Sequence, residues 1–184
     1  MTQNFISTTS NPNVFISYDV ELLLLQLQHS DGVIRQHSRE VLGKLGRQVV
    51  PLLIELLSHR SEHVRWEACK TLARIKDPRS GYALAEALLD DDSDVRWVAA
   101  EALIALEQNA IEPLLQIIEV HFDSILLRQS AHHVLAVLKR ENKVDEKVEL
   151  VYEALSSIMF PMRLAVAANN ALDHLRQHRT STAG

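Results

Sequence analysis

One short pattern occurs twice in the centre of the chain, and it constrains the fold more than any other feature. Val64-Arg65-Trp66-Glu67-Ala68 is followed by Leu72 and Ile75, and Val95-Arg96-Trp97-Val98-Ala99 is followed by Leu103 and Leu106. Each position is shifted by 31 residues. A fixed period of this length is typical of stacked repeats, in which each unit is a helix pair that cannot bury its apolar face alone. The pattern therefore predicts a stack of helix pairs.

The same period extends over most of the chain. A leucine recurs in the expected second helix of each pair with steps of 30, 31, 32 and 37 residues, at Leu42, Leu72, Leu103, Leu135 and Leu172. We therefore predict an all-α fold, an α-solenoid of five helix pairs over residues 18–178. Residues 1–17 are rich in Ser, Thr and Asn and are expected to form a mobile N-terminal arm, or alternatively a lid over the first helix. Residues 179–184 are expected to be a disordered tail.

Composition limits the possible functions. The 184 residues are 47% hydrophobic but only 5% aromatic, and five Gly and five Pro are too few for a turn-rich β protein. The net charge of -5 gives no reason to expect nucleic acid or an anionic membrane as a partner. A single cysteine, Cys69, suits a reducing compartment, and neither a membrane span nor a signal peptide is evident. The expected location is cytoplasmic.

A helical wheel separates the two tryptophans from the core. In the helix from Ser61 to Ile75, the core stripe contains Val64, Ala68 and Leu72, whereas Trp66 lies on the opposite side. Trp97 takes the same place one repeat later. Two exposed indoles on adjacent helices would form an aromatic ridge suited to a protein partner. The alternative is that each indole packs between neighbouring repeats and fills the groove there.

The predicted partner-binding residues continue along this face. They are Gln36, Arg39, Trp66, Lys70, Trp97, Glu101, Gln129, His132 and His133. Adjacent residues in a helix point about 100° apart, so His132 and His133 are not expected to chelate one ion together. His174 and His178 have helical spacing but lie near the tail. No metal site and no catalytic residue are predicted.

Charge is distributed unevenly. Arg35, Arg65, Arg96 and Arg128 share one repeat position, and we interpret them as structural residues that bond to neighbouring acids and carbonyls along the stack, with an anion site as the alternative. Between Arg35 and Arg79 there are ten basic and five acidic residues, whereas Ser80 to Leu127 contain one basic and ten acidic residues. This polarity is suited to orienting a charged partner and repels phosphate backbones.

The repeat resembles a known family. The pattern Asp94-Val95-Arg96-Trp97-x-Ala99-x-x-Ala102-Leu103, together with Asp77-Pro78-Arg79 at the start of a helix, is similar to the HEAT repeats of the phycobilisome-lyase type. The resemblance implies a right-handed superhelix whose second helices line a concave surface. Such repeats occur in bilin lyases, in phycobilisome-degradation factors and in unrelated adaptors, so the resemblance is specific for architecture rather than for activity.

Enzyme motifs are absent from the sequence. It has no Gly-rich phosphate loop, no Gly-x-Ser-x-Gly and no Cys-x-x-Cys, and it lacks the His-Glu dipeptides of HEAT-like di-iron hydroxylases. We therefore predict a non-catalytic adaptor or scaffold without a cofactor, which binds another protein through its second helices. The alternative, implied by the resemblance, is a bilin lyase or lyase-like chaperone subunit that binds a phycobilin. Its partner would be a phycobiliprotein subunit or a second HEAT-repeat subunit.

Overall fold

The computed structural model describes residues 20–156 and 161–182. Residues 20–26 are helical, and there is no β-strand in the described ranges. The further α-helices are α2 (Gly32–Leu45), α3 (Val50–Leu56), α4 (Glu62–Ile75), α5 (Gly81–Glu86), α6 (Ser93–Leu106), α7 (Ile111–Val120), α8 (Ile125–Arg140), α9 (Glu146–Ser156) and α10 (Pro161–Thr182). Short 3-10 turns lie between them at η1 (Gly46–Gln48), η2 (Pro78–Ser80), η3 (Ala87–Leu89) and η4 (Glu107–Ala110).

The starts of several second helices are fixed by capping side chains. Asp31 accepts a hydrogen bond from the backbone N of Val33 at the start of α2. Asp92 accepts from the backbone N of Asp94 and of Val95 at the start of α6. These bonds satisfy donors that the helix itself leaves unpaired, so they define where each second helix begins.

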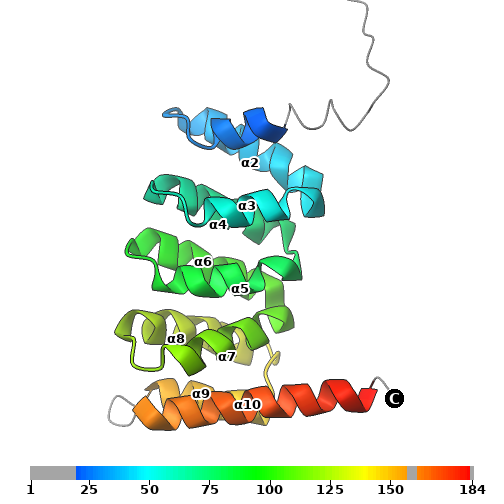
Figure 1. Ribbon diagram of the computed structural model, residues 1–184, viewed down its shortest axis with the longest axis vertical. Helices are drawn as coiled ribbons and strands as arrows, with labels where there is room; N and C mark the ends of the chain where they lie inside the picture. The colour runs from blue at the N-terminus through cyan, green and yellow to red at the C-terminus, as the bar shows by residue number, and fades with distance from the viewer. Residues whose placement is uncertain (1–19, 157–160, 183–184) are drawn as a thin grey trace, which may run out of the picture.

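The helices form two layers that run along the stack (Figure 1). The helices α3, α5 and α7 lie in one layer, and α2, α4, α6 and α8 lie behind them in the other. Along the second layer, α4 packs against α2 and α6, and α6 packs against α8. The prediction of an all-α solenoid of stacked helix pairs is confirmed. The predicted arm, residues 1–17, lies outside the described residues.

The last helix pair differs from the expected order. Helix α9 packs against α8 and so continues the second layer, whereas α10 packs against α7 and α9. Leu172 therefore lies in the first-helix layer, and aligning it with the second-helix leucines was wrong. The long step of 37 residues marks this change. Helix α10 also continues to Thr182, so residues 179–182 are helical rather than part of a disordered tail, and Arg179 forms an ion pair with Glu112 of α7.

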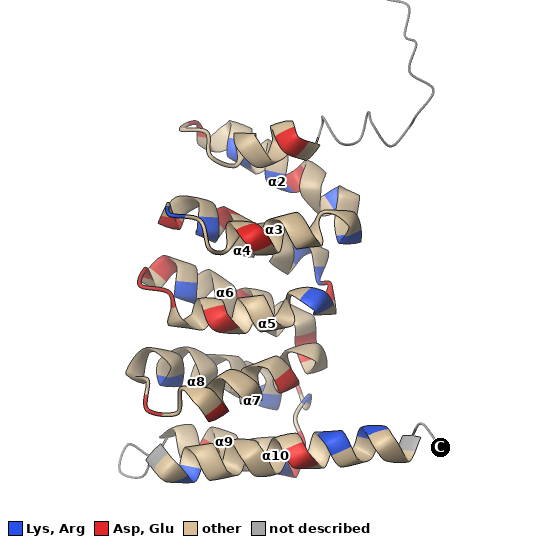
Figure 2. Ribbon diagram, in the orientation of Figure 1, with Lys and Arg blue, Asp and Glu red and all other residues tan. Residues whose placement is uncertain are grey.

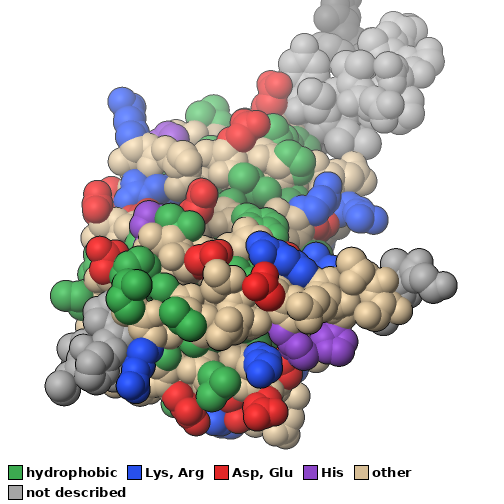
Figure 3. Space-filling view, turned by 60° about the horizontal axis from the view of Figure 1, so that its bottom comes forward, with side chains coloured by type: hydrophobic (Ala, Val, Ile, Leu, Met, Phe, Trp, Pro, Cys, Tyr) green, Lys and Arg blue, Asp and Glu red, His purple; other side chains and the backbone are tan. Residues whose placement is uncertain are grey.

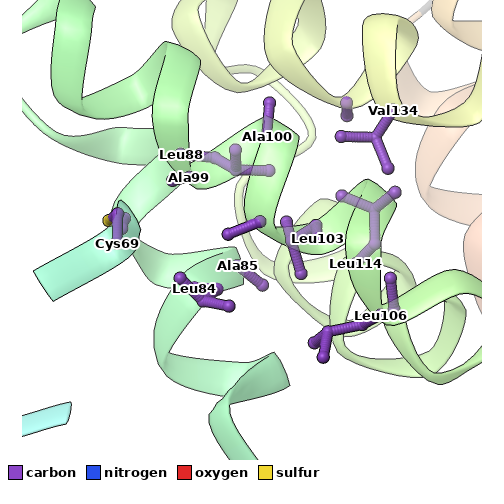
Figure 4. Close-up of a cluster of buried hydrophobic side chains, with 14 of the residues drawn as sticks. Cys69, Leu84, Ala85, Leu88, Ala99, Ala100, Leu103, Leu106, Leu114 and Val134 are labelled. Carbon is purple, nitrogen blue, oxygen red and sulfur yellow. The ribbon is translucent and has the colours of Figure 1, made fainter. Parts of the chain in front are cut away.

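A continuous apolar core lies between the two layers. Figure 4 shows Leu84 of α5, Leu88 of the turn after α5 and Leu103 of α6 within one cluster of buried hydrophobic side chains. These three side chains are completely buried. Cys69 is also buried, and this burial raises the pKa of its thiol to about 12, so it acts as a small packing residue.

None of the described helices combines the length and the apolar content that a membrane span requires. The longest of them, α10, has 22 residues and carries both acidic and basic side chains, among them Asp173 and Arg176. Figure 2 shows that charged residues occur along the whole stack and are most concentrated at its two loop edges, and the space-filling view in Figure 3 shows acidic and basic side chains interspersed with hydrophobic ones on one face.

Candidate binding surface on the second-helix layer

Two cationic side chains, Arg39 and Lys70, lie over the ring of Trp66. The side chain is half-buried and packs against the hydrophobic core cluster. The Arg39 guanidinium carbon, from α2, and the Lys70 ammonium, one turn further along α4, each lie 5.5 Å from the centre of the Trp66 ring. Cations at this distance from an indole interact favourably with its π face. For Trp66, packing between repeats therefore describes the structure better than an exposed ridge does.

Trp97 is the exposed tryptophan. Its exposed fraction is 59%, and its ring stacks on His133 of α8 with 4.8 Å between the ring centres and an angle of 23° between the planes. The Nε2 atom of His133 lies 3.0 Å from Oε1 of Glu101, which is on the same helix as Trp97. Trp97, Glu101 and His133 thus form one cluster across two repeats, and the face of the indole that does not stack on His133 is exposed to solvent.

A second aromatic pair extends this surface toward the C-terminal end of the stack. His132 stacks on Tyr152 of α9 with 4.7 Å between the ring centres, and the Lys139 ammonium lies 5.2 Å from the Tyr152 ring centre. Sequence reasoning missed Tyr152, because it placed α9 in the first-helix layer. The remaining two predicted residues, Gln36 and Gln129, are exposed, and Gln36 donates to Glu40.

The predicted residues therefore form a row of local clusters across the second-helix layer. At one end, Arg39 and Lys70 enclose Trp66. In the middle, Glu101 and His133 support Trp97. At the other end, His132 contacts a tyrosine from the last pair. We call this row the aromatic surface; its members are Arg39, Trp66, Lys70, Trp97, Glu101, His132, His133, Lys139 and Tyr152.

Each of the four equivalent arginines donates to backbone carbonyl oxygens, and three of them, Arg35, Arg65 and Arg128, also connect neighbouring repeats. Arg35 donates to the carbonyl oxygens of His29 and Ser30 in its own repeat and to Glu67 in the next. Arg128 donates to the carbonyl oxygens of Ala154 and Leu155 of the last pair.

Arg65 and Arg96 make the same kind of contact within their own repeats. Arg65 donates to the carbonyl oxygen of His59, and Arg96 donates to the carbonyl oxygen of Asp90. The interpretation of these arginines as structural residues is confirmed.

Asp90 forms an ion pair with Arg65, the arginine of the preceding repeat. Arg65 Nε donates to Asp90 Oδ2 at 2.6 Å and Nη2 donates to Oδ1 at 2.7 Å, and the backbone N of Asp92 donates to Oδ1 at 2.9 Å. Burial alone would raise the pKa of the Asp90 carboxyl group. The hydrogen bonds from Arg65 and Asp92 outweigh burial and hold this pKa below its usual range.

Glu67 is a buried carboxylate at the base of a polar groove. Only 1% of its side chain is exposed, and it accepts hydrogen bonds from Arg35 and Arg39. The groove has a volume of about 570 Å³ and lies beside Trp66 and His63, along the starts of α2, α4 and α6. Because the two guanidinium groups already bind Glu67, the groove presents no pair of uncommitted cations for an anionic ligand.

The histidines do not converge on a common point. His132 stacks on Tyr152 whereas His133 binds Glu101, so the two rings have different partners. The rings of His174 and His178 meet edge to face with 4.3 Å between their centres. Within the described ranges, no group of three or more His, Cys, Asp or Glu side chains has the geometry of a metal site.

The comparisons with known proteins agree with this architecture. Residues 20–104 match the HEAT repeats family. The chain is similar to a chain in the complex of CpcE and CpcF of phycocyanin lyase from Nostoc sp. PCC7120, with 23% identity and a TM-score of 0.58, over 82% of this chain and 98% of that chain. No curated protein matches.

An engineered protein and a designed protein match with lower TM-scores. An engineered protein has 18% identity and a TM-score of 0.41 over 82% of this chain and 76% of that chain. A designed armadillo repeat protein in complex with the peptide (KR)4 has 14% identity and a TM-score of 0.37 over 87% and 84%. Residues 20–104 thus match HEAT repeats, and the two-layered stack has a fold similar to that of the phycocyanin lyase chain.

Proposed function

We propose that this chain is a non-catalytic adaptor that binds another protein through its aromatic surface, with Trp97 at the centre of the contact. The observation that carries the proposal is the state of Trp97, which is exposed over more than half of its surface and yet is fixed by the stack on His133. A large side chain that is ordered before binding loses little conformational entropy when a partner covers it. Tryptophan is also among the residues that contribute most to protein interfaces.

The surroundings of Trp97 suit a partner of mixed character. Glu101 and His133 place polar atoms beside the indole, and Lys70 adds a positive charge over the neighbouring Trp66. A contact with an apolar centre and a polar rim is the usual composition of a protein interface. Gln36, Gln129 and His132 would lie at the edge of this contact.

The test compares two exposed aromatic residues on opposite layers. Trp97→Ala removes the proposed centre, whereas Tyr82→Ala removes a side chain of α5 that is 48% exposed on the first-helix layer. Affinity capture from a lysate of the source organism, followed by mass spectrometry, should show partners that bind the wild type and Tyr82→Ala but not Trp97→Ala. Both variants must first give the helical circular dichroism of the wild type.

Two outcomes would contradict the adaptor proposal. If Trp97→Ala retains every partner, the aromatic surface is not the contact. If Tyr82→Ala loses the same partners, the first-helix layer contributes equally, and the assignment to one layer is wrong.

The likeness in fold to the phycocyanin lyase chain supports a second candidate, a bilin lyase or lyase-like chaperone subunit. In this case the partner would be a phycobiliprotein subunit or a second HEAT-repeat subunit, and a phycobilin would be the bound ligand. Visible absorption after mixing with a purified bilin distinguishes the candidates. A plain adaptor leaves the pigment spectrum unchanged, whereas a lyase-type protein shifts it, and the shift should disappear in Trp97→Ala.

A further inference from the structure

A group of basic side chains lies at one loop edge of the stack, away from the aromatic surface. Lys44 is in the last turn of α2, Arg47 is in η1, Arg74 is in the last turn of α4, and Lys76 follows α4 directly. Figure 2 shows blue segments at these ends of α2 and α4, on the right of the view, and Arg79 follows in η2. We call Lys44, Arg47, Arg74, Lys76 and Arg79 the basic edge.

Direct contacts bring these residues from two repeats together. Arg74 lies across α2 at Gly43, where a Cβ atom would come within 2.5 Å of Arg74 Cδ, so only glycine leaves room for it. Lys44 is the next residue along the chain. On the other side, Arg79 Nη2 donates to the carbonyl oxygen of Arg47 at 2.6 Å. The edge is therefore a continuous part of the surface.

The charges of the basic edge are largely uncompensated. Arg79 forms an ion pair with Asp77, at 2.9 Å between Nε and Oδ1. Lys44, Arg47, Arg74 and Lys76 have no ion-pair partner among the described residues. Cations near helix C-termini interact favourably with the helix dipole, and this interaction stabilises Lys44, Arg74 and Lys76 at the ends of α2 and α4 without neutralising their charge.

One loop on the opposite edge has the reverse sign. Asp90, Asp91 and Asp92 lie between α5 and α6, and Figure 2 shows this loop in red on the left. The basic edge attracts and orients an acidic partner, and the acidic loop of the same molecule repels the phosphates of a nucleic acid.

We propose that the basic edge binds an acidic segment of a protein, extended along the ends of α2 and α4. Adjacent packed helices are about 8 to 10 Å apart. An extended chain advances about 3.3 Å per residue, so acidic residues about three apart would each meet a cation of a different helix. The inference is independent of the proposed function, since none of these cations belongs to the aromatic surface.

The test measures binding of a fluorescein-labelled hexaglutamate peptide by fluorescence anisotropy. The variant Lys44→Gln/Arg74→Gln/Lys76→Gln removes three charges of the basic edge. The matched control Arg60→Gln/Arg140→Gln/Lys147→Gln removes three exposed cations elsewhere, so both proteins have the same net charge. The wild type should bind the peptide with an affinity that falls as salt rises, the first variant should bind about tenfold more weakly, and the control should change less than about twofold.

A neutral substitution tests the geometry without changing the charge. Gly43→Ala displaces Arg74 while favouring the helix, and it should weaken peptide binding about threefold. Trp97→Ala should leave it unchanged. The proposal is overturned if the two triple variants weaken binding equally, if Gly43→Ala has no effect, or if single-stranded DNA of equal charge binds more tightly than the peptide at the same salt.

Discussion

Trp66 and Trp97 occupy the same place in consecutive repeats, and yet they have opposite surroundings. Trp66 is half-buried beneath Arg39 and Lys70, whereas Trp97 is 59% exposed and stacks on His133. The backbone position and the residue type are the same in both cases. The difference therefore comes from the side chains that neighbouring turns and repeats supply.

Two substitutions account for most of this contrast. One turn after Trp66 the chain has Lys70, whose ammonium lies over the indole, whereas one turn after Trp97 it has Glu101, which binds His133 instead. Arg39 covers Trp66 from the preceding repeat, and the residue equivalent to it for Trp97 is Cys69, which is buried and carries no charge. A repeat array can thus keep its core constant and vary its surface from one unit to the next.

The largest expected effect tests whether the core is indeed constant. Leu72 and Leu103 are equivalent and are both completely buried. Leu72→Ala and Leu103→Ala should each lower the free energy of unfolding by about 2 to 5 kcal/mol, because each leaves a cavity that the stack cannot close. Urea denaturation followed by circular dichroism measures both values. If the losses of unfolding free energy in the two variants differed by as much as either loss itself, the cores of the two repeats would not be equivalent.

The next effect concerns the tryptophans. Trp66→Ala should lower the free energy of unfolding by about 2 kcal/mol, since it removes a half-buried ring and leaves Arg39 and Lys70 without their aromatic contact. Trp97→Ala should lower it by less than about 0.5 kcal/mol, because most of that ring is exposed. The same denaturation measurement applies. If Trp66→Ala and Trp97→Ala lowered the free energy of unfolding equally, the difference in exposure between the two rings would have no effect on stability.

The repeat architecture could be predicted from the sequence because burial imposes a period. Leu72 and Leu103 must face the core in every copy, so a shift of 31 residues is visible in the chain itself. The carbonyl and acid contacts of Arg35 and its equivalents were predictable for the same reason. The order of helices in the last pair was not, because α9 and α10 meet only one neighbouring repeat and their sequences are free to depart from the period.

The surface was predictable only in part. A helical wheel places Trp66 and Trp97 correctly away from the core stripe, but it treats each helix alone. Whether an indole is covered depends on side chains from another helix, such as Arg39 for Trp66 and His133 for Trp97. The helical wheel contains no information about these contacts between repeats, so it made two different environments look the same.

A smaller effect follows from the link between the second and third repeats. Because the pKa of Asp90 is lowered in the folded state, the stability that this group contributes is present at pH values above its pKa in the unfolded chain and is lost as the pH falls through the folded-state pKa. Asp90→Asn should therefore lower the free energy of unfolding by about 1 kcal/mol at neutral pH. The difference from wild type should shrink in acid. A difference that stays constant down to strongly acidic pH would show that the carboxylate charge is not what stabilises this link.

The smallest expected effect is on solvent access rather than on stability, and it tests the origin of the contrast between the two tryptophans directly. Glu101→Lys gives Trp97 the same neighbour one turn away that Lys70 provides for Trp66. In a Trp66→Phe background, where Trp97 is the only tryptophan, acrylamide quenching of its fluorescence should decrease, and the free energy of unfolding should change by less than about 0.5 kcal/mol. Glu101→Gln retains an acceptor for His133 but adds no cation, so it should leave the quenching unchanged. The decrease should be partial, because Trp97 lacks a second cation from the preceding repeat like that of Arg39 over Trp66. If Glu101→Lys leaves Trp97 as accessible as before, the cover over Trp66 comes from the neighbouring repeat alone, and the residue one turn away does not determine which tryptophan is exposed.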